Sequence, residues 1–252
     1  MLNCNCKASG NPMGTYTYIE KHAGWAEIVL NRPERRNALI PPMAGEITQA
    51  VEGLQTDPEV ASILIRGEDG YLCSGIDLKA LQADPAPDWQ GKDVGDVRSM
   101  HMAFYRCRKP LLCALQRFAI NAGAALVFAC DITVAGHASF LQIGEIQQGS
   151  DMPMNAGWLK LKSTEQVLLR LSLMGDRVLG PELVTLGLAL RSVEDEQVLE
   201  NVREIAARLA SFPAGASETI IERIRGMRPD DAESVFPVSS NQALLTASQV
   251  RS

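Results

Sequence analysis

The chain has 252 residues, of which 46% are hydrophobic and 21% are charged, and its formal net charge at pH 7 is −6. This composition is typical of a soluble globular protein, and the acidic balance argues against nucleic acid as a partner. Residues 118–135 form an apolar stretch as long as a membrane span. Because Asn121 and Asp131 interrupt it, a buried core segment and no membrane partner are expected.

The amino-terminal residues 1–13 lack the apolar region of a secretory signal, and they predict a disordered tail on a cytoplasmic protein. Cys4 and Cys6 have no second Cys/His pair nearby that would complete a metal site. The remaining cysteines lie in apolar segments and are expected to be reduced core residues: Cys73, Cys107, Cys113 and Cys130.

The first part of the chain alternates strand and helix patterns. Strands are predicted over 16–20 and 25–30, with a hairpin turn between them. A helix is predicted over 42–55, because Pro42 suits the first turn of a helix. Residues 63–66 then form another strand pattern.

The second part begins with a stretch rich in Pro, Asp and Gly, residues 84–95, which predicts a mobile loop. A helix is predicted over 97–108, and a strand, turn, helix and strand follow over 111–135. From residue 163 onward the pattern is almost entirely helical, with helices predicted over 164–174, 181–186, 194–210 and 216–227.

Two turns in this order have the features of an anion or carbonyl site. Asn121-Ala122-Gly123 leads from a strand into a buried helix, and the first turn of such a helix exposes N–H groups with partial positive charge. The segment C-S-G-I-D-L, residues 73–78, repeats the pattern of strand, glycine turn and helix start. Two such turns can each direct one N–H at the same developing oxyanion. The alternative is that both are ordinary glycine turns.

Five motifs in the same order resemble the crotonase family, also called the enoyl-CoA hydratase/isomerase family. The resemblance covers residues 16–250 and rests on L-N-R-P with R-N-A-L (30–39), C-S-G-I-D-L (73–78), A-C-D-I (129–132), E-I-x-x-G (145–149) and M-G-D-R (174–177). It implies an α/β spiral of strand–strand–helix turns over 14–190 and a C-terminal α-helical region over 191–252. It also implies a homotrimer or a dimer of trimers.

The resemblance assigns the two N–H donors to Ile76 and Ala122. The family places glycine at the second position, so the methyl group of Ala122 is expected to narrow the pocket or to shift the turn. The substrate implied is an acyl-CoA thioester, so coenzyme A is part of the substrate, and neither another cofactor nor a metal is expected.

The carboxylates depart from the family's hydratases, which use two glutamates. The first position is Ala125, and the second matches Glu145, although the spacing from Phe140 is one residue longer than expected. A lone glutamate in an apolar pocket has its pKa raised by desolvation, which suits a base that returns the proton to the same substrate. Asp151 is a candidate for a second acidic group, and its alternative role is that of a turn former.

Coenzyme A has anionic phosphates and needs a local cluster of positive charge. The resemblance places the segment containing Arg32, Arg35 and Arg36 near these phosphates, and Arg36 fits the family position best. The alternative is a solvated charged loop. The complete set predicted to bind coenzyme A is Arg32, Arg36, Ala38, Ser74, Asp77 and Leu78.

The function expected from these residues is enolate stabilisation by two N–H groups with one glutamate as acid and base. Such an arrangement resembles the Δ3,Δ2-enoyl-CoA isomerases and favours isomerase-type proton transfer over simple hydration. Two alternatives remain open, because a fold does not fix a reaction. One is a CoA-ester hydrolase, lyase or decarboxylase, and the other is a non-catalytic acyl-CoA-binding pseudoenzyme.

Overall fold

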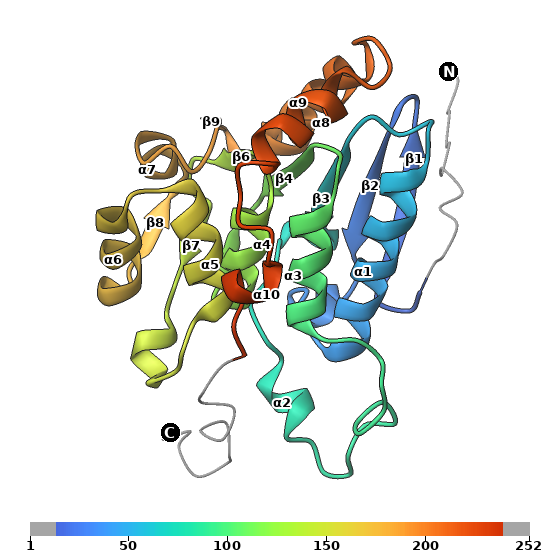
Figure 1. Ribbon diagram of the computed structural model, residues 1–252. Helices are drawn as coiled ribbons and strands as arrows, with labels where there is room; N and C mark the ends of the chain where they lie inside the picture. Colours follow the sequence, from blue (N-terminus) through green and yellow to red (C-terminus); the bar gives the residue numbers. More distant parts are fainter. Residues whose placement is uncertain (1–13, 239–252) are drawn as a thin grey trace, which may run out of the picture.

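The computed structural model describes residues 14–238, which form two β-sheets surrounded by helices (Figure 1). The predicted tail at 1–13 lies outside the described residues, as does the end of the predicted 191–252 region. The larger sheet has the strand order β1-β2-β3-β4-β6-β9, with β1 antiparallel to β2 and the other neighbours parallel. Its strands are β1 (Thr17–His22), β2 (Trp25–Leu30), β3 (Ile63–Gly67), β4 (Leu111–Leu115), β6 (Ile132–Gly136) and β9 (Arg191–Val193).

The smaller sheet has the order β5-β7-β8, with β5 parallel to β7 and β7 antiparallel to β8. Its three strands are β5 (Phe118–Ile120), β7 (Phe140–Gln142) and β8 (Arg177–Leu179). The chain passes through both sheets in each turn of the fold, in the order β4, β5, α4 (Ala122–Ala129) and then β6, β7, α5 (Pro153–Lys162). The turn after β3 follows the same path, because Cys73 bridges Ala119 of β5. The predicted spiral of strand–strand–helix turns is confirmed.

Helices cover both faces of the larger sheet. Successive side chains of a strand point to opposite faces, so neighbouring apolar residues pack against different helices. Ile63 and Ile65 belong to the main core, which also contains buried side chains of α1 (Pro41–Thr56), α3 (Val97–Arg106) and α4. Leu64, between them, packs with Val198 and Val202 of α8 (Val198–Ala210) on the other face. Figure 1 shows α1 and α3 side by side in front of β2 and β3.

The remaining helices lie at the edges of this core. None of the helices between residues 14 and 238 is both long and apolar enough to cross a membrane. They are α2 (Leu78–Leu81), α6 (Glu165–Met174), α7 (Gly180–Thr185), α9 (Ala216–Arg225), α10 (Ala232–Val235) and the short 3-10 turns η1 (Pro33–Arg35), η2 (Glu68–Gly70), η3 (Glu145–Gln148) and η4 (Asp195–Gln197).

The expectation of an almost entirely helical chain beyond residue 163 is wrong in two places. Strands β8 and β9 interrupt the helices, and β9 pairs in parallel with β6, so residues 191–193 extend the larger sheet. Each of these strands has three residues, too few for a repeating pattern of hydrophobic and polar positions. The four cysteines expected in the core are buried and free: Cys73, Cys107, Cys113 and Cys130.

Candidate active site

The first predicted turn, around Gly75, leaves one N–H group unused. Gly75 has φ +97°, a conformation that side chains rarely adopt. Leu39 N donates to Gly75 O at 2.7 Å, and Asp77 N donates to Leu39 O at 2.9 Å. In a parallel bridge of this kind the N–H of Ile76, which lies between Gly75 and Asp77, points away from Leu39. No hydrogen bond joins the N–H of Ile76 to an acceptor among the described residues.

The second predicted turn contains Asn121 and Ala122, at the start of α4. Ala122 is the first helical residue, and its N–H also has no acceptor among the residues that the structure describes. Asn121 has φ 53° and ψ −116°, a conformation normally reserved for glycine. Its carbonyl oxygen accepts from Ala124 N at 2.9 Å and Ala125 N at 3.2 Å, which starts the helix.

The two turns pack directly against each other. A Cβ atom on Gly123 would lie 2.4 Å from Cys73 O, and one on Gly75 would lie 2.9 Å from Ile120 O. Ile120 N also donates to Cys73 O at 3.1 Å. Glycine is therefore required on both sides of the contact, and the turns that carry the Ile76 and Ala122 N–H groups are neighbours, as a shared oxyanion site requires.

Glu145 lies at the start of η3 and is buried. Its Oε1 accepts from Asn155 Nδ2 at 2.9 Å, whereas its buried Oε2 has no hydrogen-bond partner among the described residues. Burial raises the pKa of Glu145 to about 7, against the opposing effects of its own backbone N–H and of Asn155. A carboxyl group with this pKa can both accept and return a proton near neutral pH.

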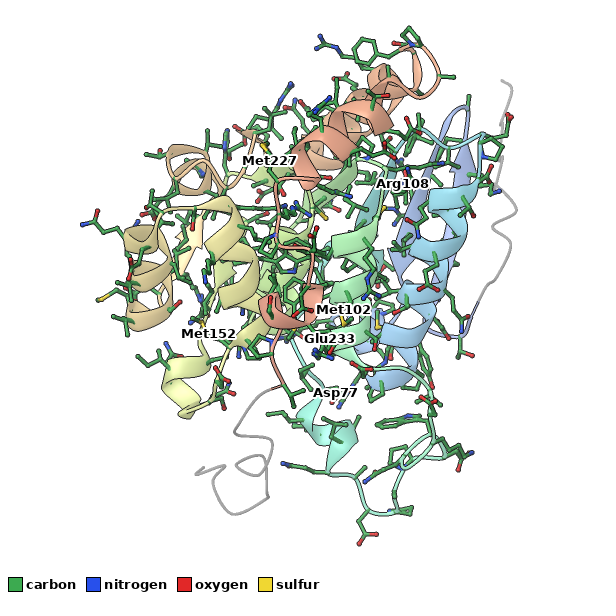
Figure 2. All side chains as sticks on the ribbon, viewed as in Figure 1. Asp77, Met102, Arg108, Met152, Met227 and Glu233 are labelled. Atoms are coloured by element: carbon green, nitrogen blue, oxygen red, sulfur yellow. The ribbon has the colours of Figure 1, made fainter. Side chains whose placement is uncertain are left out.

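The two other positions considered for a second carboxylate, Ala125 and Asp151, differ in exposure. Ala125 is fully buried in α4, so the position that the resemblance assigns to the family's first glutamate holds a small core side chain. Asp151 is exposed, and its Oδ1 accepts from Met152 N at 2.7 Å just before α5. This bond is typical of a turn former, and a catalytic role for Asp151 stays a prediction. Figure 2 shows Met152 near the start of α5 and Asp77 beside α2.

Asp77 organises the predicted CoA-binding segment. Its carboxylate accepts from Arg32 Nη2 at 3.1 Å, Arg35 Nη2 at 2.9 Å and Ala80 N at 3.0 Å, the last as the cap of α2. Burial by itself would raise the pKa of Asp77, but the hydrogen bonds from Arg35, Ala80 and Arg32 outweigh it and lower the pKa to about 2. The ion pairs of Asp77 with Arg32 and Arg35 therefore join the loop before α2 to the loop after β2.

The remaining predicted CoA-binding residues surround that pair. Arg36 is exposed, with no side-chain partner among the described residues, so its guanidinium group is the cation available to a phosphate. The Ala38 carbonyl oxygen accepts from Arg32. Ser74 Oγ donates to Arg35 O at 3.3 Å, and Leu78 begins α2.

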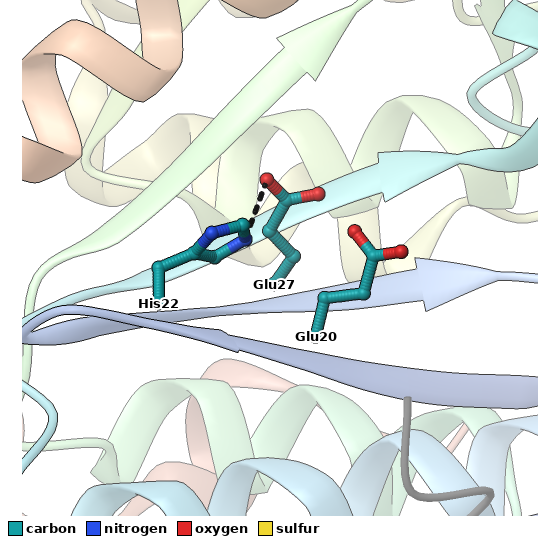
Figure 3. Close-up of side chains that lie close together, drawn as sticks. All are labelled: Glu20, His22 and Glu27. Carbon is teal, nitrogen blue, oxygen red and sulfur yellow. Dashed lines mark ion pairs between the residues drawn. The ribbon is translucent and has the colours of Figure 1, made fainter. Parts of the chain in front are cut away.

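One group of side chains has ligand types that suit a metal: Glu20, His22 and Glu27, close together on β1 and β2 (Figure 3). Both carboxylate oxygens of the fully buried Glu27 are occupied by guanidinium groups, because Oε2 accepts from Arg66 Nε at 2.5 Å and Oε1 from Arg203 Nε at 2.6 Å. Two arginines already supply the positive charge that a cation would bring. We therefore interpret this group as a structural link between α8 and the sheet.

Asn155, which contacts Glu145, is not among the site residues predicted from the sequence. It stands in the sequence M-N-A-G-W between residues that fit an apolar helix face. A buried amide requires hydrogen-bond partners, and this requirement was the only signal available from the sequence.

Comparisons with known proteins point to one family. The sequence model of the enoyl-CoA hydratase/isomerase family matches residues 20–236. Enoyl-CoA hydratase EchA19 of Mycobacterium tuberculosis is 29% identical over 216 residues, 84% of this chain and 81% of that protein. The peroxisomal Δ(3,5)-Δ(2,4)-dienoyl-CoA isomerase of Arabidopsis thaliana is 28% identical over 190 residues, 69% of this chain and 67% of that protein.

A solved structure shows the same fold. The enoyl-CoA hydratase/isomerase of Pseudoalteromonas atlantica superposes with a TM-score of 0.79 at 20% identity, covering 94% of this chain and 92% of that one. At this identity the likeness concerns the fold alone. The match of the family model over residues 20–236 shows that the chain belongs to the enoyl-CoA hydratase/isomerase family.

Proposed function

We propose that the chain is an acyl-CoA enzyme that stabilises an enolate and moves a proton with a single glutamate. The thioester oxygen accepts hydrogen bonds from the N–H groups of Ile76 and Ala122, and Glu145 Oε2 takes the α-proton. The observation that carries this proposal is the buried Glu145 with a pKa of about 7 and one oxygen without a partner. Loss of one oxyanion donor typically costs about 3 kcal/mol of transition-state stabilisation.

The missing second carboxylate favours isomerase-type proton transfer over hydration. Adding water to a double bond requires one group to orient and deprotonate the water and another to deliver a proton. Ala125 can do neither, whereas Glu145 alone can move a proton between two carbons of one substrate. Both activities appear among the relatives, which include proteins named as hydratases and as isomerases.

The remaining parts of the proposal concern binding, assembly and location. The phosphates of coenzyme A interact with Arg36, which is exposed and, unlike its neighbours Arg32 and Arg35, is not paired with Asp77. The active assembly is a homotrimer or a dimer of trimers. The cytoplasmic location stays a prediction, since the names of two relatives specify a mitochondrial and a peroxisomal protein.

Hydrogen exchange tests the proposal directly. The protein is incubated in deuterated water with saturated, 2-enoyl and 3-enoyl CoA esters, and deuterium at the α-carbon is measured by mass spectrometry. We expect exchange, together with migration of the double bond in the 3-enoyl ester. Tight CoA-ester binding without exchange would identify a pseudoenzyme instead, and release of free coenzyme A would identify a hydrolase.

A further inference from the structure

One side chain, Asn155, contacts both halves of the proposed catalytic machinery. It lies in the first turn of α5 and is 1% exposed. Its Nδ2 donates to Glu145 Oε1 at 2.9 Å and to the Asn121 carbonyl oxygen at 3.1 Å. The two N–H bonds of one amide are thus shared between the base and the residue that precedes α4.

The contact with Asn121 acts on the oxyanion donor itself. The Asn121 carbonyl and the Ala122 N–H belong to one planar peptide group, so fixing the direction of the oxygen also fixes the direction of the N–H. A peptide group that accepts a hydrogen bond at its oxygen is polarised and becomes a better donor at its N–H. Asn155 therefore adds to the bonds from Ala124 N and Ala125 N in orienting and strengthening this donor.

This peptide group needs external support because of the backbone conformation at Asn121. A residue other than glycine with φ 53° and ψ −116° persists only where its surroundings hold it. Asn121 N donates to Gln142 O at 2.8 Å, and Asn121 Oδ1 accepts from Gly144 N at 2.7 Å. These bonds tie the turn to the segment that enters Glu145, and Asn155 closes the connection from the other side.

The contact with Glu145 decides which oxygen reacts. The influences on the carboxyl group are its burial, its own backbone N–H and the Asn155 amide, and none of them is a charged group. Because Asn155 occupies Oε1, the oxygen left for proton exchange is Oε2, which has no partner among the described residues. Donation to a carboxylate also favours its ionised form.

We propose that Asn155 is a positioning residue that holds the Glu145 carboxyl group and the Asn121–Ala122 peptide group in a fixed mutual geometry, so that base and oxyanion donor act on the same thioester. The inference rests on the proposed function and deepens it by adding a residue to the site.

Two variants test this role, Asn155→Ala and Asn155→Ser, the second of which keeps one small donor and serves if the first does not fold. The first measurement is the pKa of Glu145 in the ligand-free protein, by carbon-13 NMR of labelled glutamate assigned with Glu145→Gln. Loss of the amide donor is expected to raise this pKa above its native value of about 7.

The second measurement is the infrared carbonyl stretch of bound acetyl-CoA labelled at the thioester carbon. The native protein and Glu145→Gln are expected to lower the stretching frequency relative to free acetyl-CoA, because two N–H groups donate to the oxygen. In Asn155→Ala the frequency should return toward the free value, with kcat for exchange reduced about tenfold or more and KM within about twofold.

Asn201→Ala is the matched control, since Asn201 Nδ2 also donates to a backbone carbonyl, Gln197 O at 3.1 Å, on α8 and without contacting Glu145 or Asn121. Both readouts should keep their native values in this control. A native pKa and a native stretch in the Asn155 variants would overturn the proposal, as would a raised pKa beside an unchanged stretch. If the native protein bound no acyl-CoA, the proposed function would fail, and an unchanged pKa in the ligand-free variants would separately overturn the role of Asn155.

Discussion

Glu145 is a buried carboxyl group without a charged partner among the described residues, and this environment governs its protonation. Burial raises its pKa to about 7, so near neutral pH the carboxylate and the carboxylic acid are present in comparable amounts. A base that must return the proton it takes works best in this range. The same property has a cost, because the folded protein must hold a buried negative charge at alkaline pH.

The kinetic consequence is tested with Glu145→Gln. Removing the base is expected to reduce α-proton exchange by about 100-fold or more while leaving CoA-ester affinity nearly unchanged. The native rate should rise with pH around a midpoint near 7, because only the ionised carboxylate accepts a proton. Near-native exchange in Glu145→Gln would move the role of base to Asp151 or to a group outside the protein.

The same substitution has a stability consequence with a defined sign. The pKa of Glu145 is raised from 4.5 when the chain folds, so the unfolded chain loses its proton first and stability falls as the pH rises from 4.5 to about 7. Glu145→Gln removes this loss. The change in the free energy of unfolding on substitution should be more favourable at pH 8 than at pH 4, by up to about 3 kcal/mol. Urea denaturation at both values measures it, and equal changes would contradict the raised pKa.

At the scale of elements, α4 supplies both the Ala122 N–H and the place of the absent glutamate. Small residues allow this helix to begin inside the core, with Gly123 in contact with the first turn. Under the proposed function, the start of α4 is therefore the element on which the choice between hydration and isomerisation depends.

Ala125→Glu tests that choice. If position 125 faces the thioester, the new carboxylate lies opposite Glu145 and can hold a water molecule, so hydration of crotonyl-CoA should increase from a weak native rate. The variant should lose about 1–3 kcal/mol of stability because a larger side chain enters a fully buried position. Product formation is followed by the loss of absorbance of the conjugated thioester.

Ala124→Glu is the matched control, since Ala124 is equally buried on the same helix turn but faces another direction. It should show a similar loss of stability without a gain in hydration. Efficient hydration by the native protein that does not depend on Glu145 would contradict this account of the site.

The sequence predicts elements well where a long pattern meets clear stop signals. The strand predicted over 25–30 has the bounds of β2, and the helix predicted over 42–55 differs from α1 by one residue at each end. Helix α5 was not predicted, because Gly157 interrupts its pattern. In the structure a Cβ atom on Gly157 would lie 2.5 Å from Val235 O, so this glycine permits close contact with the segment containing α10.

The parts of the site that can be predicted from the sequence are those with a local sequence pattern. The turns that carry Ile76 and Ala122 have local signatures, so both could be named from the sequence. Asn155 acts through contacts with residues 10 and 34 positions away, which no local pattern encodes. The ion pair between Arg32 and Asp77 likewise joins residues 45 positions apart, so the sequence did not show that Arg32 already has a partner.

At the scale of the whole molecule, exposed apolar side chains mark a surface that residues 14–238 leave uncovered. Leu169, Leu173 and Met174 of α6 are 47%, 60% and 60% exposed. Ile146, next to Glu145, is 46% exposed, and its Cγ2 would lie 3.0 Å from a Cβ atom on Gly175, at the end of α6. The patch formed by these four side chains therefore adjoins the proposed base. Patches of this kind on soluble proteins commonly mark sites of association.

We predict that this patch is buried in a homotrimer or a dimer of trimers, and that assembly supports the geometry of η3. Light scattering at micromolar concentration should give the mass of three or six chains of 27.4 kDa. Leu173→Lys should shift the mass toward one chain, because a buried lysine without a partner opposes association. Lys160→Glu changes charge at another exposed position and should leave the mass unchanged. If the patch supports η3, the Leu173→Lys chain should also lose exchange activity on dilution, while Lys160→Glu should not. A native protein with the mass of one chain would rule out the assembly.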